Sequence, residues 1–383
     1  MSDRDPIVAR LANGVAEFEA AEWDSCAGSD NPFLSHAFLS ALELSGSAAG
    51  ATGWQPVPIA IDGSDGSPAA VMPAYLKSHS HGEYVFDHSW AAAYERAGGG
   101  YYPKLQIAVP FTPVPGRRLL SRDPALAPAL IAAAETLVRN NRLSSAHATF
   151  IAEEEVPLFR EAGWLIRADL QFHWHNRHYR SFDDFLAALS SRKRKAIRRE
   201  RAAALPGLEV EHVTGGAIEE RHWDAFWAFY QDTGSRKWGR PYLTRSFFSL
   251  LGEKMADRLL LIFATRAGAP IAGALNLIGS DCLYGRYWGA IEDVPNLHFE
   301  ICYHQAIEAA IERGLARVEA GAQGPHKLSR GYSPVPTWSA HHIADPRLRE
   351  AVASYLEAER PAVLREIEQL DEMTPFRKAA PDA

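Results

Sequence analysis

Near the C-terminal end of the chain, several polar and charged residues are close enough in sequence to act together on a substrate. Residues 318–342 are predicted to begin as a strand that breaks at Gly321 and Gly324. Six polar or charged residues then follow closely before another aromatic strand: Glu319, Gln323, His326, Lys327, Arg330 and Tyr332. Glycine lets the backbone approach a ligand closely, and a packed core has no use for so many donors and charges. The segment is therefore a candidate site, and the alternative interpretation is a solvated loop with a glycine turn.

A second concentration of charge lies in the middle of the chain. Seven of the ten residues from 192 to 201 are Arg or Lys, in the second part of a predicted long helix that Ser181 can cap. Like charges at this density repel one another unless an anion neutralises them. We expect this basic helix to bind a phosphate-bearing substrate, and the alternative is a solvated helix face. The residues selected for binding are Arg194, Arg198 and Arg199.

Two further groups of residues in the second half are candidates for the same site. Glu300 and His304 are four residues apart on a predicted helix, so they share one face and could supply a general base. An ordinary surface contact is the alternative for this pair. Arg286, Tyr287 and Trp288 lie where a predicted meander of strands should open, and we take them as substrate-binding residues. Aromatic residues such as Tyr287 and Trp288, or Trp238 upstream, are otherwise typical of a core.

Two groups of residues resemble a hydrolase triad and a metal site, but their positions in the sequence do not support either one. Asp87, His88 and Ser89 are consecutive, and consecutive residues of a predicted strand point to opposite faces, so they cannot form a hydrolase triad. No G-x-S-x-G motif is present either. His173 and His175 share a strand face, but no cysteine or carboxylate completes a metal-binding set. The sequence thus predicts neither a serine nucleophile nor a metal site.

Length and composition set the class of protein. The chain has 383 residues, which favours two domains, and its hydrophobic content of 47% and charged content of 23% are those of a soluble globular protein. A net charge of -7 argues against a protein that coats nucleic acid. The three scattered cysteines, the polar N-terminus and the short apolar runs predict a cytoplasmic protein that does not insert into a membrane.

The elements that must position these residues occur in the same order in both halves of the chain. The second half contains three predicted strands at 259–265, 270–278 and 282–290, then a helix at 297–313 and a strand at 317–320. The first half contains β-rich segments at 54–61, 69–77 and 82–90, then a helix at 124–139 and strands near 146–151 and 164–174. We therefore expect two copies of one α/β unit, packed face to face with a cleft between them.

Three segments resemble the FemAB-like predicted N-acyltransferases, a bacterial family associated with peptidoglycan biosynthesis or recognition. They are Asn31–Glu43 (NPFLSHAFLSALE), Tyr102–Gly116 (YPKLQIAVPFTPVPG) and Glu319–Tyr332 (EAGAQGPHKLSRGY). The resemblance covers nearly the whole chain, from about residue 7 to residue 360. Lys104, in the second segment, is selected as a substrate-binding residue.

That family is similar to the Fem aminoacyltransferases, so the resemblance implies an α/β fold of two tandem GNAT-like domains, here residues 1–178 and 179–383. It implies an N-acyltransferase that moves an acyl or aminoacyl group to an amine of a small or cell-wall-related acceptor. The basic helix resembles the Arg/Lys-rich segment of Fem enzymes before their second domain, which implies a transient contact with transfer RNA. The segment at Lys327 resembles their phenylalanine–lysine–glycine motif, with His326 in place of the aromatic residue. Lys327 or Arg330 could stabilise the oxyanion of acyl transfer.

Two other functions remain open from the sequence. An acyl-CoA-dependent GNAT enzyme normally carries an R/Q-x-x-G-x-G/A loop, but residues 292–298 occupy its place and Pro295 removes one amide that would bind phosphate. A non-catalytic module that recognises peptidoglycan fragments is the other alternative. We expect no tightly bound cofactor, and an acyl donor that is either aminoacyl-tRNA or acyl-CoA.

Overall fold

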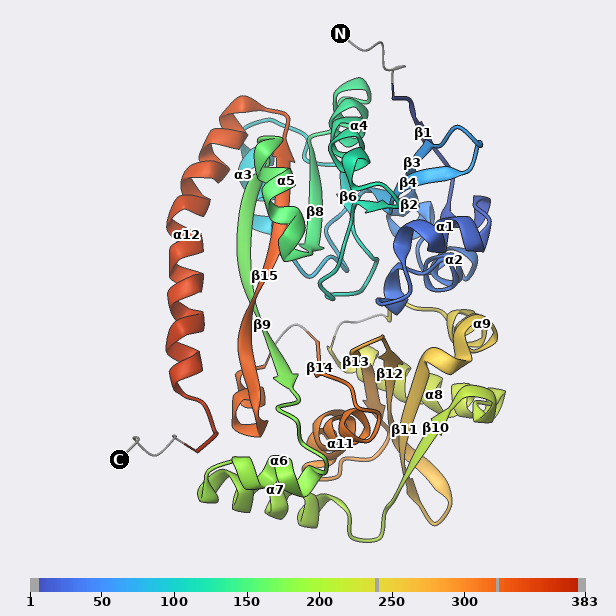
Figure 1. Ribbon diagram of the computed structural model, residues 1–383, viewed down its shortest axis with the longest axis vertical. Helices are drawn as coiled ribbons and strands as arrows, with labels where there is room; N and C mark the ends of the chain where they lie inside the picture. Colours follow the sequence, from blue (N-terminus) through green and yellow to red (C-terminus); the bar gives the residue numbers. More distant parts are fainter. Residues whose placement is uncertain (1–6, 238–240, 322–323, 378–383) are drawn as a thin grey trace. The chain divides into compact units, whose positions relative to one another are not determined.

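The chain folds into two compact units, and the computed structural model describes residues 7–237, 241–321 and 324–377 (Figure 1). The first unit comprises residues 1–169 and 336–364, and the second comprises residues 170–335 and 365–383. The expected division at residues 178 and 179 gave two contiguous domains. Here the chain returns to the first unit after residue 335, so neither unit is contiguous.

The first unit contains two sheets. A four-stranded sheet has the order β1-β3-β4-β7, and the strands β2-β5-β6-β8-β15 pair in that order in the other. These strands are β1 (Ala9–Leu11), β2 (Trp54–Pro56), β3 (Ile59–Asp62), β4 (Pro68–Met72), β5 (Ala74–Lys77), β6 (Lys104–Ile107), β7 (Leu120–Ser121), β8 (Ser145–Ile151) and the greater part of β15 (Tyr332–Ile343). Strand β6 is parallel to β8, and the helix between them packs its apolar stripe on the core.

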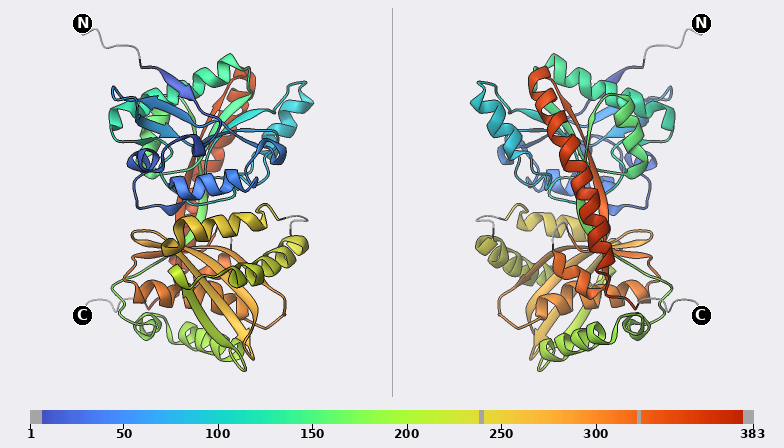
Figure 2. Two further views of the ribbon diagram at one scale, coloured as in Figure 1. Left: turned by 90° about the vertical axis from the view of Figure 1, so that its right-hand side faces the viewer. Right: turned by 90° about the vertical axis from the view of Figure 1, so that its left-hand side faces the viewer.

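The helices of the first unit are α1 (Ala20–Ala27), α2 (His36–Leu44), α3 (His88–Arg96), α4 (Ala127–Asn140), α5 (Val156–Glu161) and the greater part of α12 (Pro346–Glu372). Helix α4 buries Leu130, Ile131, Ala134 and Val138, which recur at helical spacing. Helix α12, the long red helix in Figure 2, packs its own apolar stripe against Trp90 of α3.

The second unit is built on the strand order β10-β11-β12-β13-β14-β9. Its strands are β10 (Glu209–Thr214), β11 (Leu259–Arg266), β12 (Ala269–Ile278), β13 (Cys282–Ala290), β14 (Arg317–Glu319) and the second part of β9 (Leu165–His175). Strand β11 is buried along nearly its whole length, as expected for an apolar run covered on both faces. The predicted order of a meander, a helix and a strand is confirmed here, and β13 is parallel to β14.

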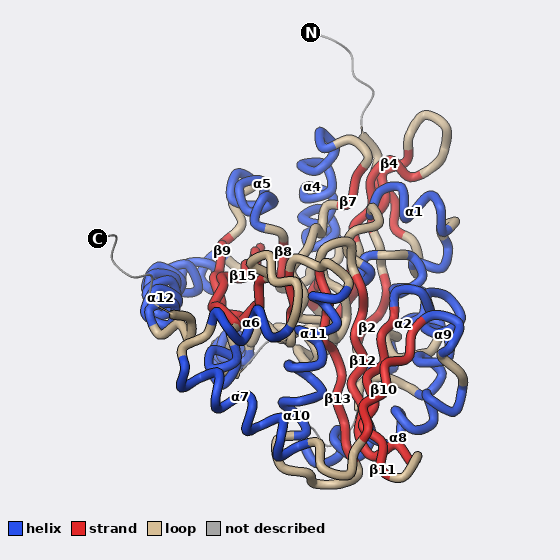
Figure 3. Tube along the Cα trace, turned by 60° about the horizontal axis from the view of Figure 1, so that its bottom comes forward, coloured by secondary structure: helices blue, strands red, loops and turns tan. Residues whose placement is uncertain are grey.

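Helices cover both faces of this sheet (Figure 3). They are α6 (Phe182–Ala188), α7 (Ser191–Ala204), α8 (Glu220–Lys237), α9 (Arg245–Met255), α10 (Leu297–Phe299) and α11 (Gln305–Glu312), with a π-helical turn, η8 (Glu300–His304), between the last two. Tyr287 of β13 contacts Tyr230 of α8, whereas its neighbour Trp288 contacts His298 of α10. Because consecutive strand residues point to opposite faces, α8 and α10 lie on opposite sides of β13.

Two predicted elements were wrong. Residues 82–90 are not a strand, because Gly82 has a positive φ of 81° and helix α3 begins at His88. The predicted long basic helix is two helices, α6 and α7, because Leu189 takes an extended conformation and forms a β-bridge with Phe376. Ser181 caps α6 as expected, since its side chain accepts from the backbone N–H of Asp184. Within the described residues, no helix is both long and apolar enough to cross a bilayer.

Candidate functional site

A pocket in the second unit forms where two parallel strands stop pairing. Strands β13 and β14 pair only as far as Tyr284 and Glu319. Just beyond that point β13 bulges, because Gly285 and Tyr287 pair with consecutive residues of β12 and Arg286 is the extra residue. The strands therefore diverge at their carboxyl ends, which is where α/β folds bind ligands.

The pocket has a volume of about 100 Å³. Strands β12 and β13 line one side of it, and α10 and η8 line the other. Its principal lining residues are Asn276, Arg286, Trp288, His298, Cys302 and Tyr303. Trp288 and His298 meet edge to face with ring centroids 5.4 Å apart. A space this small accepts a short chemical group rather than a whole drug-sized ligand.

Asn276 brings an unusual polar group to this pocket. The side chain is fully buried, and its amide nitrogen donates to the carbonyl of Leu260 at 3.2 Å. Its Oδ1 accepts no hydrogen bond from any residue that the structure describes. A buried acceptor without a donor is destabilising, so this atom is suited to a ligand N–H.

Lys327 lies on the short 3-10 helix η9 (Pro325–Arg330), close enough to Arg286 and Cys302 of the pocket to interact with them electrostatically. Its side chain is 1% exposed, and Nζ donates to the carbonyl of Gly321 at 2.7 Å. Burial lowers the pKa of Lys327 to about 7; the Arg286 guanidinium contributes in the same direction and the Cys302 thiol opposes it. The pKa of this lysine therefore lies near neutral pH, and the lysine is electrostatically coupled to two residues of the pocket.

The side chain of Arg330, which could have stabilised an oxyanion, instead connects η9 to helix α7. Its Nε and Nη2 donate to the two carboxylate oxygens of Glu200 at 3.1 and 2.8 Å, and its guanidinium lies 3.5 Å from the centroid of the Phe299 ring. His304 shares the same carboxylate, with Nε2 3.4 Å from Oε2 of Glu200. These contacts form a chain from η8 through α7 to η9.

Glu300 and His304 have separate partners in the structure. Glu300 is fully buried and accepts from Arg201 of α7 at 3.0 Å and from Gln305 at 2.8 Å. His304 instead faces Glu200. Because both side chains are engaged with α7, the contacts favour a role in holding that helix rather than the acid–base pair expected from their spacing.

The other predicted site residues around Lys327 differ in exposure and in their contacts. His326 is exposed, and its Nε2 is 2.9 Å from the hydroxyl of Tyr303. Tyr332 is fully buried and its ring contacts Tyr303 with centroids 5.7 Å apart. Gln323 lies outside the described residues, as does Trp238.

Helix α7 has two chemically different faces. Arg201 and Glu200 turn towards η8 and η9, where they bind Glu300 and Arg330. Arg198 and Arg199 are exposed, and Arg198 forms a 3.4 Å ion pair with the exposed Asp183. Arg194 is half-buried. The outward face of α7 therefore presents a dense positive surface.

Lys104 lies in the first unit, in a buried ionic cluster. Its Nζ donates to Glu83 at 2.8 Å and also to Asp87, and all three side chains are almost completely buried. Burial would raise the pKa of Asp87, but the Lys104 ammonium outweighs it and holds that pKa well below its usual range. The two carboxylates raise the pKa of Lys104 against the effect of burial. The contacts of Lys104 with these two buried carboxylates therefore favour a structural role over the predicted role in substrate binding.

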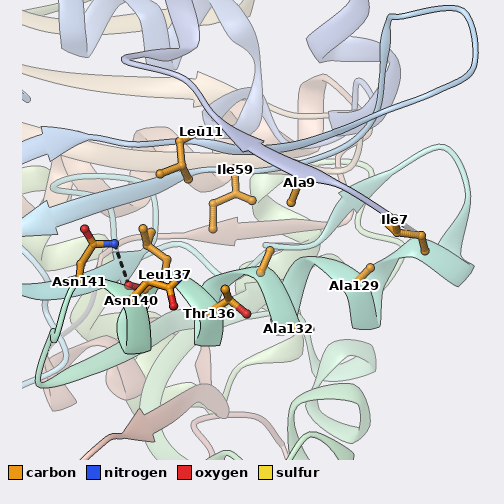
Figure 4. A pocket seen from close by; sticks show the side chains of 11 residues that line it. Ile7, Ala9, Leu11, Ile59, Ala129, Ala132, Thr136, Leu137, Asn140 and Asn141 are labelled. Carbon is orange, nitrogen blue, oxygen red and sulfur yellow. Dashed lines mark hydrogen bonds between the residues drawn. The ribbon is translucent and has the colours of Figure 1, made fainter. Parts of the chain in front are cut away.

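A hollow of about 440 Å³ lies in the first unit (Figure 4). It lies between β1 and α4, and aliphatic side chains such as Ile7, Leu11, Ile59 and Leu137 line it together with polar Thr136, Asn140 and Asn141. No charged residue is among those lining it. It therefore offers no charged side chain for proton transfer.

Sequence reasoning selected Arg286, Trp288 and Lys327 but missed Asn276 and Cys302. Asn276 could have been noticed as one polar residue inside the apolar run of β12. No local signal marked Cys302, because its position in the pocket depends on how η8 packs against β13. Among the described residues, no group of three metal-ligating side chains is close enough to hold an ion.

The fold and the duplicated arrangement of strands define a class of mixed α/β proteins with two GNAT-like units. A family model matches residues 14–378, and the chain belongs to that family, FemAB-like, described as peptidoglycan biosynthesis or recognition. No curated protein gave a significant match.

Solved structures are similar in fold at low sequence identity. The crystal structure of FemX matches with a TM-score of 0.54 and 12% identity, over 88% of this chain and 98% of that one. The C-terminal domain of a putative lysylphosphatidylglycerol synthetase from Agrobacterium fabrum matches with a TM-score of 0.53 and 10% identity, over 88% and 96%. A tandem GNAT protein from the clavulanic acid biosynthesis pathway aligns at a TM-score of 0.46 with 12% identity, over 89% and 99%.

Proposed function

We propose that this protein is a Fem-type N-acyltransferase that moves an acyl or aminoacyl group to an amine of a small or cell-wall-related acceptor. One observation carries the proposal: a buried lysine, Lys327, lies beside a small pocket at the divergence of two parallel strands. Membership of the FemAB-like family supports it.

The chemistry requires positive charge where the oxyanion forms. When the acceptor amine attacks the acyl carbonyl, the carbonyl oxygen becomes negative, and a donor fixed in a site with little water stabilises it strongly. The protonated form of Lys327, with Arg286 near it, supplies such a charge. Because only the ammonium form can do so, we expect turnover to fall as the pH rises through about 7.

The donor is proposed to be aminoacyl-tRNA rather than acyl-CoA. The hollow of about 270 Å³ beside Trp288 and His298 is lined by Glu292 and Asp293, and these carboxylates repel a pyrophosphate. The outward face of α7, by contrast, carries a row of arginines suited to a phosphate backbone. We propose no tightly bound cofactor.

Glu300, His304 and Arg330 are proposed to position the site. Arg330 is on the same 3-10 helix as Lys327, and its two bonds to Glu200 hold that helix against α7. His304 supports Glu200 from η8. Removing Arg330 should therefore displace Lys327 and lower turnover indirectly.

The experiment is to screen aminoacyl-tRNAs and acyl-CoAs as donors with amino-sugar peptides as acceptors, and to compare Lys327→Met with the wild type. Met keeps the aliphatic stem and removes the charge. Losing one oxyanion donor costs about 10²–10³ in turnover. The control is Lys254→Met, since Lys254 is an exposed lysine of α9.

Folding gives an independent check on the same variant. Burial disfavours the charged form of Lys327, so the folded state binds fewer protons than the unfolded state between about pH 7 and pH 10.5. Removing the charge should therefore leave the melting temperature unchanged or raised. Near-normal turnover in Lys327→Met, or a large loss of stability, would show that this lysine is structural.

A further inference from the structure

Cys302 is the cysteine of this chain whose surroundings differ from those of an inert core thiol. Cys26 and Cys282 are 1% and 0% exposed, and burial raises the pKa of both thiols. Cys302 is only partly buried and lines the 100 Å³ pocket. It also lies in the π-helical turn η8, and turns of this kind are frequent at functional sites.

Charged and polar groups from each surrounding element face this thiol or its pocket. Arg286 comes from β13 and Lys327 from η9, and the thiol of Cys302 raises the pKa of Lys327 against the larger effect of burial. Such an attraction is mutual, so the ammonium favours the thiolate. Further titratable neighbours among the described residues are Tyr287, His298, Tyr303 and Tyr332. The carboxylate of Glu300, two residues away, is turned to Arg201.

The same pocket contains an acceptor for a ligand. Asn276 is fully buried, and among the described residues no group donates to its Oδ1. The space in front of that oxygen is kept open by Gly285, where an added Cβ would lie 3.3 Å from Oδ1. A small molecule with an N–H group could therefore bind to Asn276 while its electrophilic carbon approaches the sulfur.

We propose that Cys302 is a modification site, a thiol activated by its pocket that reacts with small, soft electrophiles carrying an N–H donor. The inference does not depend on the proposed transfer reaction. With iodoacetamide as the probe, the thiolate sulfur forms a bond to the methylene carbon, the carbon–iodine bond breaks and iodide leaves with the electron pair. The thiol proton goes to solvent.

The first experiment measures alkylation of the native protein by iodoacetamide between pH 6 and pH 9, with the modified cysteine identified by peptide mass spectrometry and glutathione as the reference thiol. We expect Cys302 to react about tenfold faster than glutathione at pH 7, and to reach half its maximal rate at a lower pH. Cys302→Ser should abolish the fast labelling. Lys327→Met should move the half-maximal pH upwards. A rate no greater than that of glutathione at pH 7 would overturn the proposal.

The second experiment tests the role of Asn276 by comparing two small reagents. Iodoacetamide has an amide N–H, whereas methyl methanethiosulfonate has none. Asn276→Leu should lower the ratio of the iodoacetamide rate to the methanethiosulfonate rate several-fold, and any general change in the exposure of Cys302 cancels in that ratio. Gly285→Ala crowds the same oxygen and provides the same test if the Asn276 variant does not fold. An unchanged ratio in the folded variant would refute recognition of the N–H group.

Discussion

Two buried lysines in this protein differ in what surrounds the ammonium group. Lys104 donates to two carboxylates and a serine hydroxyl, which together satisfy its charge and its hydrogen bonds. Among the residues that the structure describes, Lys327 donates one hydrogen bond, to the carbonyl of Gly321, and burial lowers its pKa to about 7. A buried charge whose partners neutralise it usually has a structural role. A buried charge that lacks a counter-ion and lies beside a pocket is a candidate for a functional role.

At this scale we predict that Lys104→Met strongly destabilises the first unit. The substitution removes the ammonium that bonds both Glu83 and Asp87, and breaking a buried pair in this way costs about 3–5 kcal/mol. Lys77→Met is the matched comparison, because Lys77 is equally buried but its Nζ lies 3.9 Å from Glu83, donates to the carbonyl of His81 and lies over the Trp54 ring. Urea unfolding of both variants measures the difference; equal losses would contradict it.

Helix α7 shows how one element can serve structure and binding on different faces. Glu200 and Arg201 contact η8, η9 and α11, and they anchor the helix within the second unit. The basic residues before them are mostly exposed. The sequence places the anchoring residues and the exposed basic residues on one helix. Only the tertiary contacts show which of them stabilise the fold.

For this helix we predict that replacing Arg194, Arg198 and Arg199 by Ala weakens binding of transfer RNA and flattens its salt dependence. Each phosphate contact contributes roughly 0.7–0.9 to the slope of log K against log salt, so losing three lowers the slope by roughly 2–3. Filter binding at several salt concentrations measures it. The control is a triple variant of three exposed cations elsewhere in the unit, Arg221, Lys254 and Arg313. An unchanged slope in the α7 variant would show that the helix is only a solvated face.

Over the whole molecule, buried histidines link stability to pH. Burial lowers the pKa of His147 in the first unit and of His173 in the second to about 3. The unfolded chain, with its histidines near 6.5, binds more protons than the folded chain between pH 3 and pH 6.5. The contribution of these neutral histidines to the free energy of unfolding is therefore fully present above pH 6.5, and it decreases progressively as the pH falls.

We accordingly predict that acidification from pH 7 to pH 5 costs roughly 2 kcal/mol for each of these two histidines. His173→Gln removes one titrating group, so its melting temperature should fall less than that of the wild type over this range. His88→Gln is the control, because His88 is exposed at the start of α3. If the melting temperatures of His173→Gln and the wild type fall equally between pH 7 and pH 5, protonation of His173 does not cause the loss of stability.

The sequence by itself determined the elements whose signals are local. The apolar runs and turns predicted β11, β12 and β13 nearly to the residue, and Ser181 was recognised as a cap, because these patterns depend on neighbours in the chain. The long motifs around Lys104 and Lys327 indicated the FemAB-like family, and with it the fold of two GNAT-like units.

Only the tertiary structure decided the features that depend on distant residues. Residues 82–90 form no strand: helix α3 begins at His88, and Lys104, distant in sequence, donates to Glu83 and Asp87. The basic helix breaks where Leu189 pairs with Phe376. Asn276 and Cys302 meet at one pocket because β13 bulges and separates from β14. Each of these outcomes depends on contacts between segments far apart in the chain, which local periodicity does not encode.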